Sequence, residues 1–206
     1  MATGGGRFDA IVLAAGSGSR FGGGKLLAPW REGILLDGAL AAAFAAPIRS
    51  VTVVTGSQAV QVAAAAMGFA ERSGAPERLR IVHADDHAEG MGASLRRGAR
   101  AAPTDCEGLF VFLGDMPRIP VEVLPGLAAA IGFGADAAAP AFEGRRGHPA
   151  VFGKALIPAL QTLSGDEGAR RILAALGPRL ALVEAPDDGV LFDVDRPGDL
   201  DGAEGP

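Results

Sequence analysis

Arg20 and Lys25 are the residues best suited to bind a polyphosphate, because they lie in a glycine-rich loop that follows a short apolar run (IVLAAGSGSRFGGGKLL, residues 11–27). Glycines let backbone N–H groups approach phosphate oxygens, and the two side chains add positive charge. Of the 19 basic residues only Lys25 and Lys154 are lysine, and an ammonium is a compact point charge that can follow a moving phosphoryl group. The pattern indicates a nucleotide site; the alternative is a surface loop with incidental charge.

Two familiar phosphate-binding loops do not fit this segment. Gly16, Gly18 and the glycines at 22–24 resemble a dinucleotide fingerprint, but no helix is expected to begin directly after them. In a P-loop a serine or threonine that holds magnesium follows the lysine, and here Leu26 takes that place.

Asp115 is the first candidate ligand for a metal ion. It follows the apolar run of residues 109–113 in the sequence LFVFLGDMPRIP, where Gly114 leaves room for a ligand and Pro117 stiffens the exit. A carboxylate at the end of a strand offers the hard oxygen that Mg²⁺ prefers. The alternative is a capping aspartate in a turn that ends the strand.

Asp193 and Asp195 supply further carboxylates near the C-terminus, in the sequence FDVDRPGDL. They alternate along an extended segment before Pro197, which is expected to start a helix. Alternation sends their side chains to opposite faces, so we expect at most one of them to contact the metal ion.

Two further motifs are suited to contact a ligand. Residues 89–95 (EGMGASL) follow a predicted strand and lead into a helix, where small residues and free N–H groups fit a base or ribose; a simple turn with an N-cap is the alternative. Residues 146–149 (RGHP) and 165–170 (GDEGAR) bring a histidine and arginines that suit an anionic substrate. For His148 a structural hydrogen bond in a turn is the competing interpretation.

His83, Asp85, Asp86 and His87 form a cluster just ahead of residues 89–95. Such residue types can bind a transition metal, but we favour an ordinary solvated loop over that interpretation.

Short apolar runs alternate with helical segments along the chain, which is typical of an α/β fold with a mostly parallel sheet covered on both faces. Because ligands bind beyond the carboxyl ends of such strands, we expect the loops after Ala14, Val82 and Leu113 to meet in one crevice. The predicted strands are 10–14, 51–55, 79–82, 109–113, 137–140, 150–152 and 180–183. The predicted helices are 35–46, 59–67, 93–101, 121–131, 154–160 and 167–176.

Length and composition set outer limits on the protein. A chain of 206 residues with 49% hydrophobic residues suits one α/β domain, expected over 8–200 with flexible tails at 1–7 and 201–206. No apolar run is long enough for a membrane span, and the first ten residues lack a signal-peptide core, so a cytoplasmic location is expected. The single Cys106 excludes an internal disulfide, and a net charge of −5 argues against nucleic-acid binding.

Taken in order, LAAGSGSRFGGGKLL, EGMGASL, FLGDMP, RRGHPAVF, LSGDEGARRIL and FDVDRPGDL resemble the MobA-like nucleotidyltransferases, above all the molybdenum-cofactor cytidylyltransferases. The resemblance covers residues 8–200. It implies a Rossmann-like, GT-A-like sheet with a small acceptor-binding β insertion, a nucleotide-binding half at about 8–118 and an acceptor-binding half at about 119–200.

The resemblance also implies a reaction. The terminal phosphate of molybdopterin would attack the α-phosphorus of CTP with Mg²⁺ as cofactor, and pyrophosphate would leave. Guanylyltransferases of this group typically read Leu-Ala-Gly-Gly at the loop, whereas Leu13-Ala14-Ala15-Gly16 stands here, which favours CTP over GTP. Three alternatives remain: GTP as donor, another phosphorylated acceptor such as a sugar phosphate, and a non-catalytic carrier of the cofactor. Transient docking to a molybdenum enzyme or its chaperone is a further implied partnership.

Roles are implied residue by residue on the matching motifs. Arg20, Lys25 and Asp115 would be catalytic, and Asp115, Asp193 and Asp195 would supply metal ligands. Nucleotide binding is implied for Leu13, Ala14, Ala15, Gly16, Gly18, Lys25, Gly90, Gly92 and Ser94. Acceptor binding is implied for Arg146, His148, Asp166 and Arg170. Where relatives usually carry an Asn-Pro-x-aromatic element, this chain has residues 83–87 (HADDH), so contacts with the base or the acceptor are expected to differ there.

Overall fold

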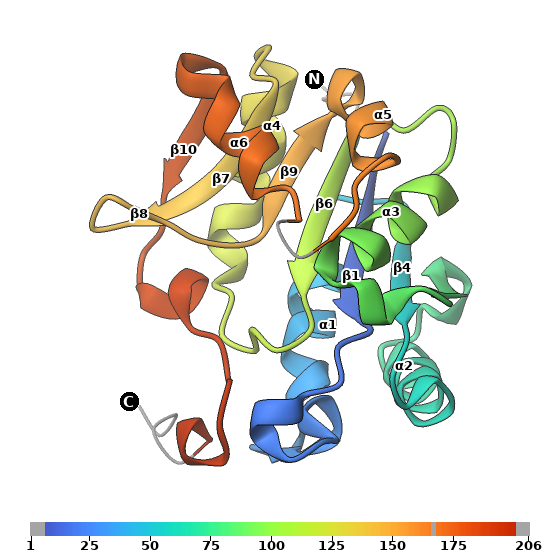
Figure 1. Ribbon diagram of the computed structural model, residues 1–206. Helices are drawn as coiled ribbons and strands as arrows, with labels where there is room; N and C mark the ends of the chain where they lie inside the picture. Colours follow the sequence, from blue (N-terminus) through green and yellow to red (C-terminus); the bar gives the residue numbers. More distant parts are fainter. Residues whose placement is uncertain (1–6, 166–167, 201–206) are drawn as a thin grey trace.

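A mixed, mostly parallel β-sheet forms the centre of the protein (Figure 1). The structure is a computed structural model and describes residues 7–165 and 168–200. Within them the main path of the sheet runs β10-β7-β9-β6-β1-β4-β5, and β8 pairs with β7. The strands are β1 (Phe8–Ala14), β4 (Val51–Thr55), β5 (Leu79–His83), β6 (Gly108–Leu113), β7 (Ala137–Phe142), β8 (Arg145–Arg146), β9 (Ala150–Gly153) and β10 (Leu180–Glu184); β2 (Pro29–Trp30) and β3 (Gly33–Ile34) form a separate hairpin.

Most neighbouring strands run parallel, as the alternation of apolar runs and helical segments predicts. β1 pairs in parallel with both β4 and β6, and β7 pairs in parallel with β10. β9 runs antiparallel to both of its neighbours, β6 and β7. The carboxyl ends of β1, β5 and β6 therefore lie at one edge of the sheet, where the loops that carry the sequence motifs begin.

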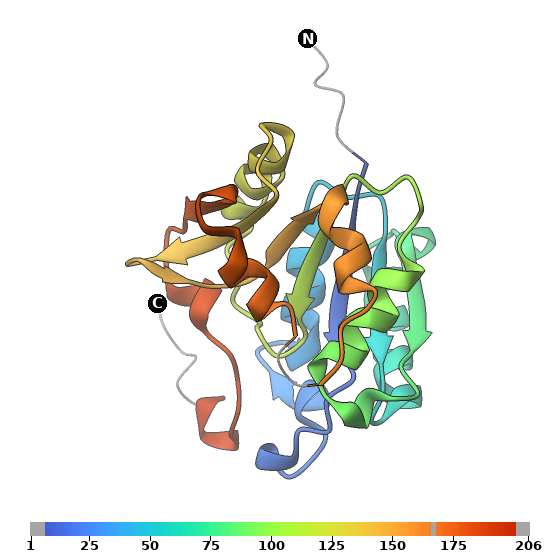
Figure 2. The same ribbon diagram turned by 45° about the horizontal axis from the view of Figure 1, so that its top comes forward.

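Helices cover both faces of the sheet, as the two views show (Figures 1 and 2). One face packs against α1, α2 and α4, and the other against α3, α5 and α6. Alternation along the strands produces the two cores: Ala10 and Val12 of β1 face the first group of helices, and Ile11 faces the second. The helices are α1 (Leu35–Ala45), α2 (Ala59–Arg72), α3 (Met91–Ala101), α4 (Leu124–Gly132), α5 (Ile157–Leu160) and α6 (Arg170–Leu176).

The predicted strands and helices are confirmed, with differences at their ends. α6 begins at Arg170, whereas the predicted helix begins at residue 167, which lies outside the described residues; the two-residue strands β2, β3 and β8 were not predicted. α2 continues five residues beyond the predicted end to Arg72, because the sequence FAER after Gly68 still favours a helix. The predicted helices at 121–131 and 154–160 each begin with a 3-10 turn, and Pro125 and Pro158 then stand in the first turn of α4 and α5. Pro197 starts only a 3-10 turn, Pro197–Asp199.

An ion-pair network closes the edge of the sheet opposite the motif loops. The side chain of Asp9, 3% exposed, accepts hydrogen bonds from Arg49 at 2.6 Å and from the Ser50 hydroxyl at 2.9 Å. Arg49 also donates to Asp105 at 2.8 Å. Nearby, burial and the charge of Asp9 raise the pKa of the Cys106 thiol to about 12, so this cysteine is a buried, protonated residue.

We expect Arg49→Met to lower the free energy of unfolding by about 3 kcal/mol, because it leaves the Asp9 carboxylate buried without a counter-charge. Urea denaturation followed by circular dichroism measures the change. The double variant Arg49→Met/Asp9→Asn should recover most of the loss, since it removes the buried charge as well. Equal losses in the single and double variants would show that packing by Arg49, and not charge compensation, stabilises this edge.

No helix in the described part of the chain is both long enough and apolar enough to cross a lipid bilayer.

Candidate active site

The glycine-rich loop leaves β1 and folds into two 3-10 turns, Ser19–Phe21 and Lys25–Leu27. Between them the backbone turns sharply, with φ of +92° at Gly22, +95° at Gly23 and +68° at Gly24, which is the left-handed region that disfavours residues with a Cβ. No α-helix follows directly, in agreement with the sequence analysis, because α1 begins only at Leu35. The loop therefore positions Lys25 through turns rather than through a helix.

Lys25 lies between two acidic side chains from distant parts of the chain. Its Nζ is 2.7 Å from Oδ2 of Asp115 and 3.6 Å from Oδ1 of Asp195, and Arg20 reaches the other oxygen of Asp195 at 3.3 Å. The Lys25 side chain is 13% exposed and that of Arg20 is 77% exposed. The structure thus brings all three predicted catalytic residues into one charge cluster with Asp195, in which Arg20 is the exposed member.

The C-terminal segment that carries Asp195 lies beside the glycine-rich loop in Figure 1. A small apolar cluster holds it there, in which Val194 packs with Trp30 and Leu35. The backbone N–H of Val194 also donates to the carbonyl oxygen of Asp115 at 3.1 Å. This contact joins the turn after β6 to the C-terminal segment, so the carboxylates on the two segments are held in register.

Asp193 completes the group of carboxylates. Its pKa is raised by partial burial and by the negative charges of Asp115 and Asp195. Both charges therefore act on Asp193, and Lys25 compensates them only in part. Hard oxygen donors with surplus negative charge suit Mg²⁺.

In the described residues no three His, Cys, Asp or Glu side chains form a ready metal cage. This arrangement still fits Mg²⁺, which commonly binds through one or two carboxylates and completes its coordination with water and substrate phosphates. Which of Asp193 and Asp195 contacts the ion stays a prediction.

We expect Asp193→Asn to raise the free energy of unfolding in metal-free buffer at neutral pH. The raised pKa means that the folded state opposes the negative charge on Asp193, so stability from this group is present at low pH and is lost as pH rises through the folded pKa. Asparagine removes the charge and therefore also removes the loss of stability at neutral pH. Thermal unfolding of both proteins at pH 7 and at a pH below 4 tests this: the difference should vanish at low pH, and a difference that persists would contradict the electrostatic cause.

A cavity of about 530 Å³ opens where the loops after β1, β5 and β6 meet. We refer to it as the nucleotide cavity. The three loops meet in one crevice, as predicted for the carboxyl edge of a parallel sheet. Its walls are Leu13, Ala15, Gly16, Ser17, His87, Ala88, Gly90, Met91, Ser94, Leu113 and Asp115.

Most residues predicted to bind the nucleotide lie in this cavity or next to it. Gly18 and Lys25 instead line an adjoining cavity of about 240 Å³ with Ser19, Arg20 and Asp195, which we refer to as the phosphate cavity. Ala14 is buried in the core of the sheet. Gly92 does not line either cavity; its N–H donates to the carbonyl oxygen of Gly165 at 2.8 Å, and the two segments are so close that a Cβ on Gly92 would lie 2.6 Å from that oxygen.

A third cavity, of about 290 Å³, holds three of the four predicted acceptor-binding residues and is referred to as the acceptor cavity. Its apolar wall includes Leu95, Val111 and Phe152. Arg146, His148 and Arg170 line the same cavity. The fourth predicted residue, Asp166, lies outside the described residues.

His148 is a neutral side chain at physiological pH. Burial lowers its pKa to about 4. The negative charge of Asp115 opposes this shift, and the positive charge of Arg146 adds to it. Its Nδ1 is buried and has no hydrogen-bond partner among the described residues, whereas its backbone N–H donates to the carbonyl oxygen of Val190 at 2.9 Å. The main chain is therefore anchored, and the neutral ring forms part of the wall of the acceptor cavity.

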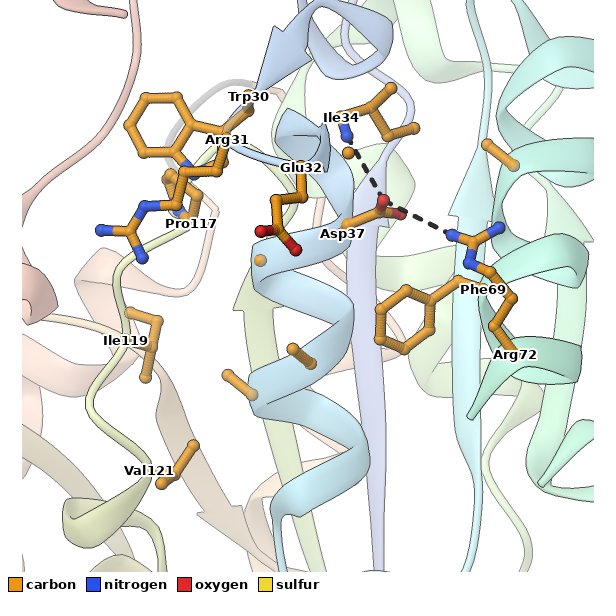
Figure 3. Close-up of a pocket in the computed structure, with 15 residues that line it drawn as sticks. Trp30, Arg31, Glu32, Ile34, Asp37, Phe69, Arg72, Pro117, Ile119 and Val121 are labelled. Atoms are coloured by element: carbon orange, nitrogen blue, oxygen red, sulfur yellow. Dashed lines mark hydrogen bonds and ion pairs between the residues drawn. The ribbon is translucent and has the colours of Figure 1, made fainter. Parts of the chain in front are cut away.

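The nucleotide and acceptor cavities share Leu13, Met91 and Leu113. Two ligands bound in them would therefore meet above the end of β1, close to Asp115. A larger cavity of about 810 Å³ lies on the outer side of α1, where Asp37 accepts hydrogen bonds from the Ile34 N–H and from Arg72 (Figure 3). None of the predicted site residues lines that cavity.

Two walls of the site, His87 and Met91, were not predicted from the sequence. His87 lines the nucleotide cavity, although it was expected in a solvated loop, and neighbouring Asp86 forms an ion pair with Arg96. The position of His87 directly ahead of residues 89–95 was the available signal. Met91 lies inside that motif, and its place as a wall common to two cavities does not follow from the sequence.

The family model for the MobA-like NTP transferase domain matches residues 10–180 of this chain. Three curated relatives match over nearly their full length. The chain is 34% identical to nicotine blue oxidoreductase from Paenarthrobacter nicotinovorans, with 90% of each chain covered. It is 30% identical to purine catabolism protein PucB from Bacillus subtilis and 28% identical to molybdenum cofactor cytidylyltransferase from Escherichia coli, with 93% of each chain covered in both cases.

Solved structures share the fold. Rv0371c from Mycobacterium tuberculosis aligns with a TM-score of 0.80 at 24% identity, over 96% of this chain and 97% of that one. A nucleotidyl transferase from Methanothermobacter thermautotroptrophicus aligns with a TM-score of 0.75 at 26% identity, over 94% of each chain. The predicted Rossmann-like nucleotidyltransferase fold is thereby confirmed.

Proposed function

Because this chain belongs to the MobA-like NTP transferase family, we propose that it transfers CMP from CTP to the terminal phosphate of molybdopterin and releases pyrophosphate. One observation carries the proposal: the nucleotide and acceptor cavities share a wall beside Asp115, which pairs with Lys25. The relative named molybdenum cofactor cytidylyltransferase supports the choice of reaction. The Leu13-Ala14-Ala15-Gly16 sequence supports CTP as the donor.

The chain's own residues suit each part of this reaction. With the base and sugar in the nucleotide cavity, the triphosphate extends into the phosphate cavity, where Arg20 and Lys25 neutralise the charge that builds on the leaving pyrophosphate. Asp115 and either Asp193 or Asp195 would hold Mg²⁺. When bound, the ion would neutralise negative charge on the phosphate oxygens.

The acceptor phosphate needs no general base, because it is already ionised at neutral pH. One of its oxygens forms a bond to the α-phosphorus of CTP, and the bond from that phosphorus to the bridging oxygen of pyrophosphate breaks. Catalysis then consists of positioning two ligands and compensating charge.

The acceptor cavity suits a flat heterocycle with an anionic group. Accessible apolar side chains such as Leu13 and Met91 can pack against a ring, and the neutral imidazole of His148 can hydrogen-bond to a ring nitrogen or a carbonyl. Arg146 and Arg170 are exposed cations on the same cavity and can contact a phosphate. A phosphorylated pterin combines both features.

Pyrophosphate release in the presence of Mg²⁺ tests the proposal, with CTP or GTP and with or without molybdopterin. Release that requires CTP and molybdopterin together supports it. Release with GTP, or with a sugar phosphate as acceptor, would assign another transferase of the same fold. Tight nucleotide binding without release under any condition would favour a carrier.

One relative has the name nicotine blue oxidoreductase, so the same assay includes an arm that follows oxidation of NADH and NADPH with nicotine blue as the hydride acceptor. The cluster of Lys25, Arg20 and three carboxylates favours transfer of a nucleotide, because hydride transfer develops no charge on a triphosphate. Oxidation of the nicotinamide without pyrophosphate release would overturn the proposal.

A further inference from the structure

His87 is a wall of the nucleotide cavity to which no role has been assigned. It does not line the phosphate cavity, whose walls come from the glycine-rich loop and Asp195. If the triphosphate occupies the phosphate cavity, His87 contacts the base or the sugar. A role for His87 in selecting the base rests on the proposed binding of a nucleotide.

Close packing holds the imidazole of His87 in place. Gly56, directly after β4, lies so near that a Cβ on it would be 2.6 Å from Cγ of His87 and 2.7 Å from the carbonyl oxygen of Ala15. The His87 backbone is anchored by a hydrogen bond from its N–H to the Ala84 carbonyl oxygen at 3.1 Å. Next to it, the ion pair of Asp86 with Arg96 of α3 ties the same turn to the helix. The base of the imidazole is therefore packed against the backbone that follows β4, which restricts its movement.

The nitrogens of His87 are free to bind a ligand. Within residues 7–165 and 168–200 the structure has no hydrogen bond or ion pair to its ring. Nearby His83 differs: its Nδ1 is 3.4 Å from the Thr55 hydroxyl and its Nε2 is 3.7 Å from Asp85. The two rings are 6.2 Å apart and lie edge to face, but only His87 reaches the cavity. The two histidines thus form a natural test pair.

The polar groups of the cavity favour cytosine over guanine. Besides Ser17, the side chains that can hydrogen-bond there are His87, Ser94 and Asp115, and Asp115 is paired with Lys25. Guanine presents adjacent N–H donors, which a free carboxylate would match. Cytosine presents one amino donor and two acceptors, which an imidazole and a hydroxyl can match, since each can donate or accept.

We propose that His87 contacts the nucleobase of the bound nucleotide and, together with Ser94, sets the preference for cytosine. A polar site built around one base rejects another because its buried groups would be left unpaired.

Isothermal titration calorimetry in the presence of Mg²⁺ tests this with CTP, dCTP, UTP and GTP. For His87→Ala we expect about a tenfold weaker Kd for CTP and for dCTP alike, and a reduced ratio of CTP to GTP affinity. The matched control is His83→Ala, which should bind all four nucleotides as the unmodified protein does. Unchanged base preference in His87→Ala would overturn the proposal, and so would a loss seen for CTP but not for dCTP, since that would assign the contact to the ribose.

A second readout does not depend on affinity. The sequence has three histidines, so their ring signals can be assigned in NMR spectra from the single variants. Addition of CTP should shift the ring signals of His87 and leave those of His148 in place; a spectrum in which bound CTP leaves His87 unshifted would contradict the contact. If the unmodified protein bound no nucleoside triphosphate in either experiment, the proposed function itself would fail, which distinguishes that failure from a failure of the His87 inference.

Discussion

Asp115→Ala is expected to lower kcat/KM for pyrophosphate release by about a thousandfold, because it removes a carboxylate on which both the metal ion and the position of Lys25 depend. The free energy of unfolding should change by only about 1 kcal/mol. The Asp115 side chain is 25% exposed, and its loss also relieves the repulsion that raises the pKa of Asp193. Steady-state kinetics and urea denaturation of the same preparations measure the two effects.

The control for this variant removes an ion pair of similar length elsewhere. Asp136 accepts a hydrogen bond from Arg179 at 2.8 Å, and neither residue lines the nucleotide, phosphate or acceptor cavity. Asp136→Ala should leave kcat/KM unchanged. If Asp115→Ala lost activity only in proportion to its loss of stability, Asp115 would be a structural aspartate. It would then be the capping residue of the turn that ends β6, which is the alternative interpretation of its motif.

Lys25→Met should lower kcat/KM by about a hundredfold or more, because it removes the partly buried cation closest to the carboxylates and the triphosphate. Lys25→Arg should not restore the activity. Lys25 is 13% exposed and lies between Asp115 and Asp195, where a planar guanidinium needs more room and presents its donors in a fixed fork. Both variants are compared by kcat and KM for CTP.

The second lysine of the chain provides the matched control for Lys25. Lys154 is exposed, lies directly after β9 and lines none of the cavities described above. Lys154→Met changes the net charge by the same amount and should leave kcat/KM unaltered. Full activity in Lys25→Arg would mean that any cation suffices at this position, and the argument for a compact ammonium would be wrong.

Local sequence patterns were sufficient to predict the longer strands and the helices, but not the two-residue strands β2, β3 and β8. Neighbouring residues such as Ile11 and Val12 point to opposite faces of a strand. A continuous apolar run therefore indicates a strand that is buried on both faces of the sheet. Element ends were less well predicted, because a proline such as Pro125 is compatible with both a 3-10 and an α-helical start.

The motifs were also sufficient to predict that Arg20, Lys25 and Asp115 would meet at the carboxyl edge of the sheet. This prediction needs only the rule that parallel strands direct their carboxyl ends to the same edge. The same rule does not identify the other residues that line the site. Met91 lines both the nucleotide and the acceptor cavity, and His87 lines the nucleotide cavity.

The order of the helices and longer strands, their mostly parallel arrangement and the charged groups available for chemistry follow from the chain's periodicity and residue types. Which of the charges pair depends on the folded arrangement. The 2.7 Å contact of Lys25 with Asp115, the packing of Val194 against Trp30 and the approach of Gly56 to His87 join segments far apart in the chain. No local pattern encodes such contacts, because they depend on how whole elements pack against one another.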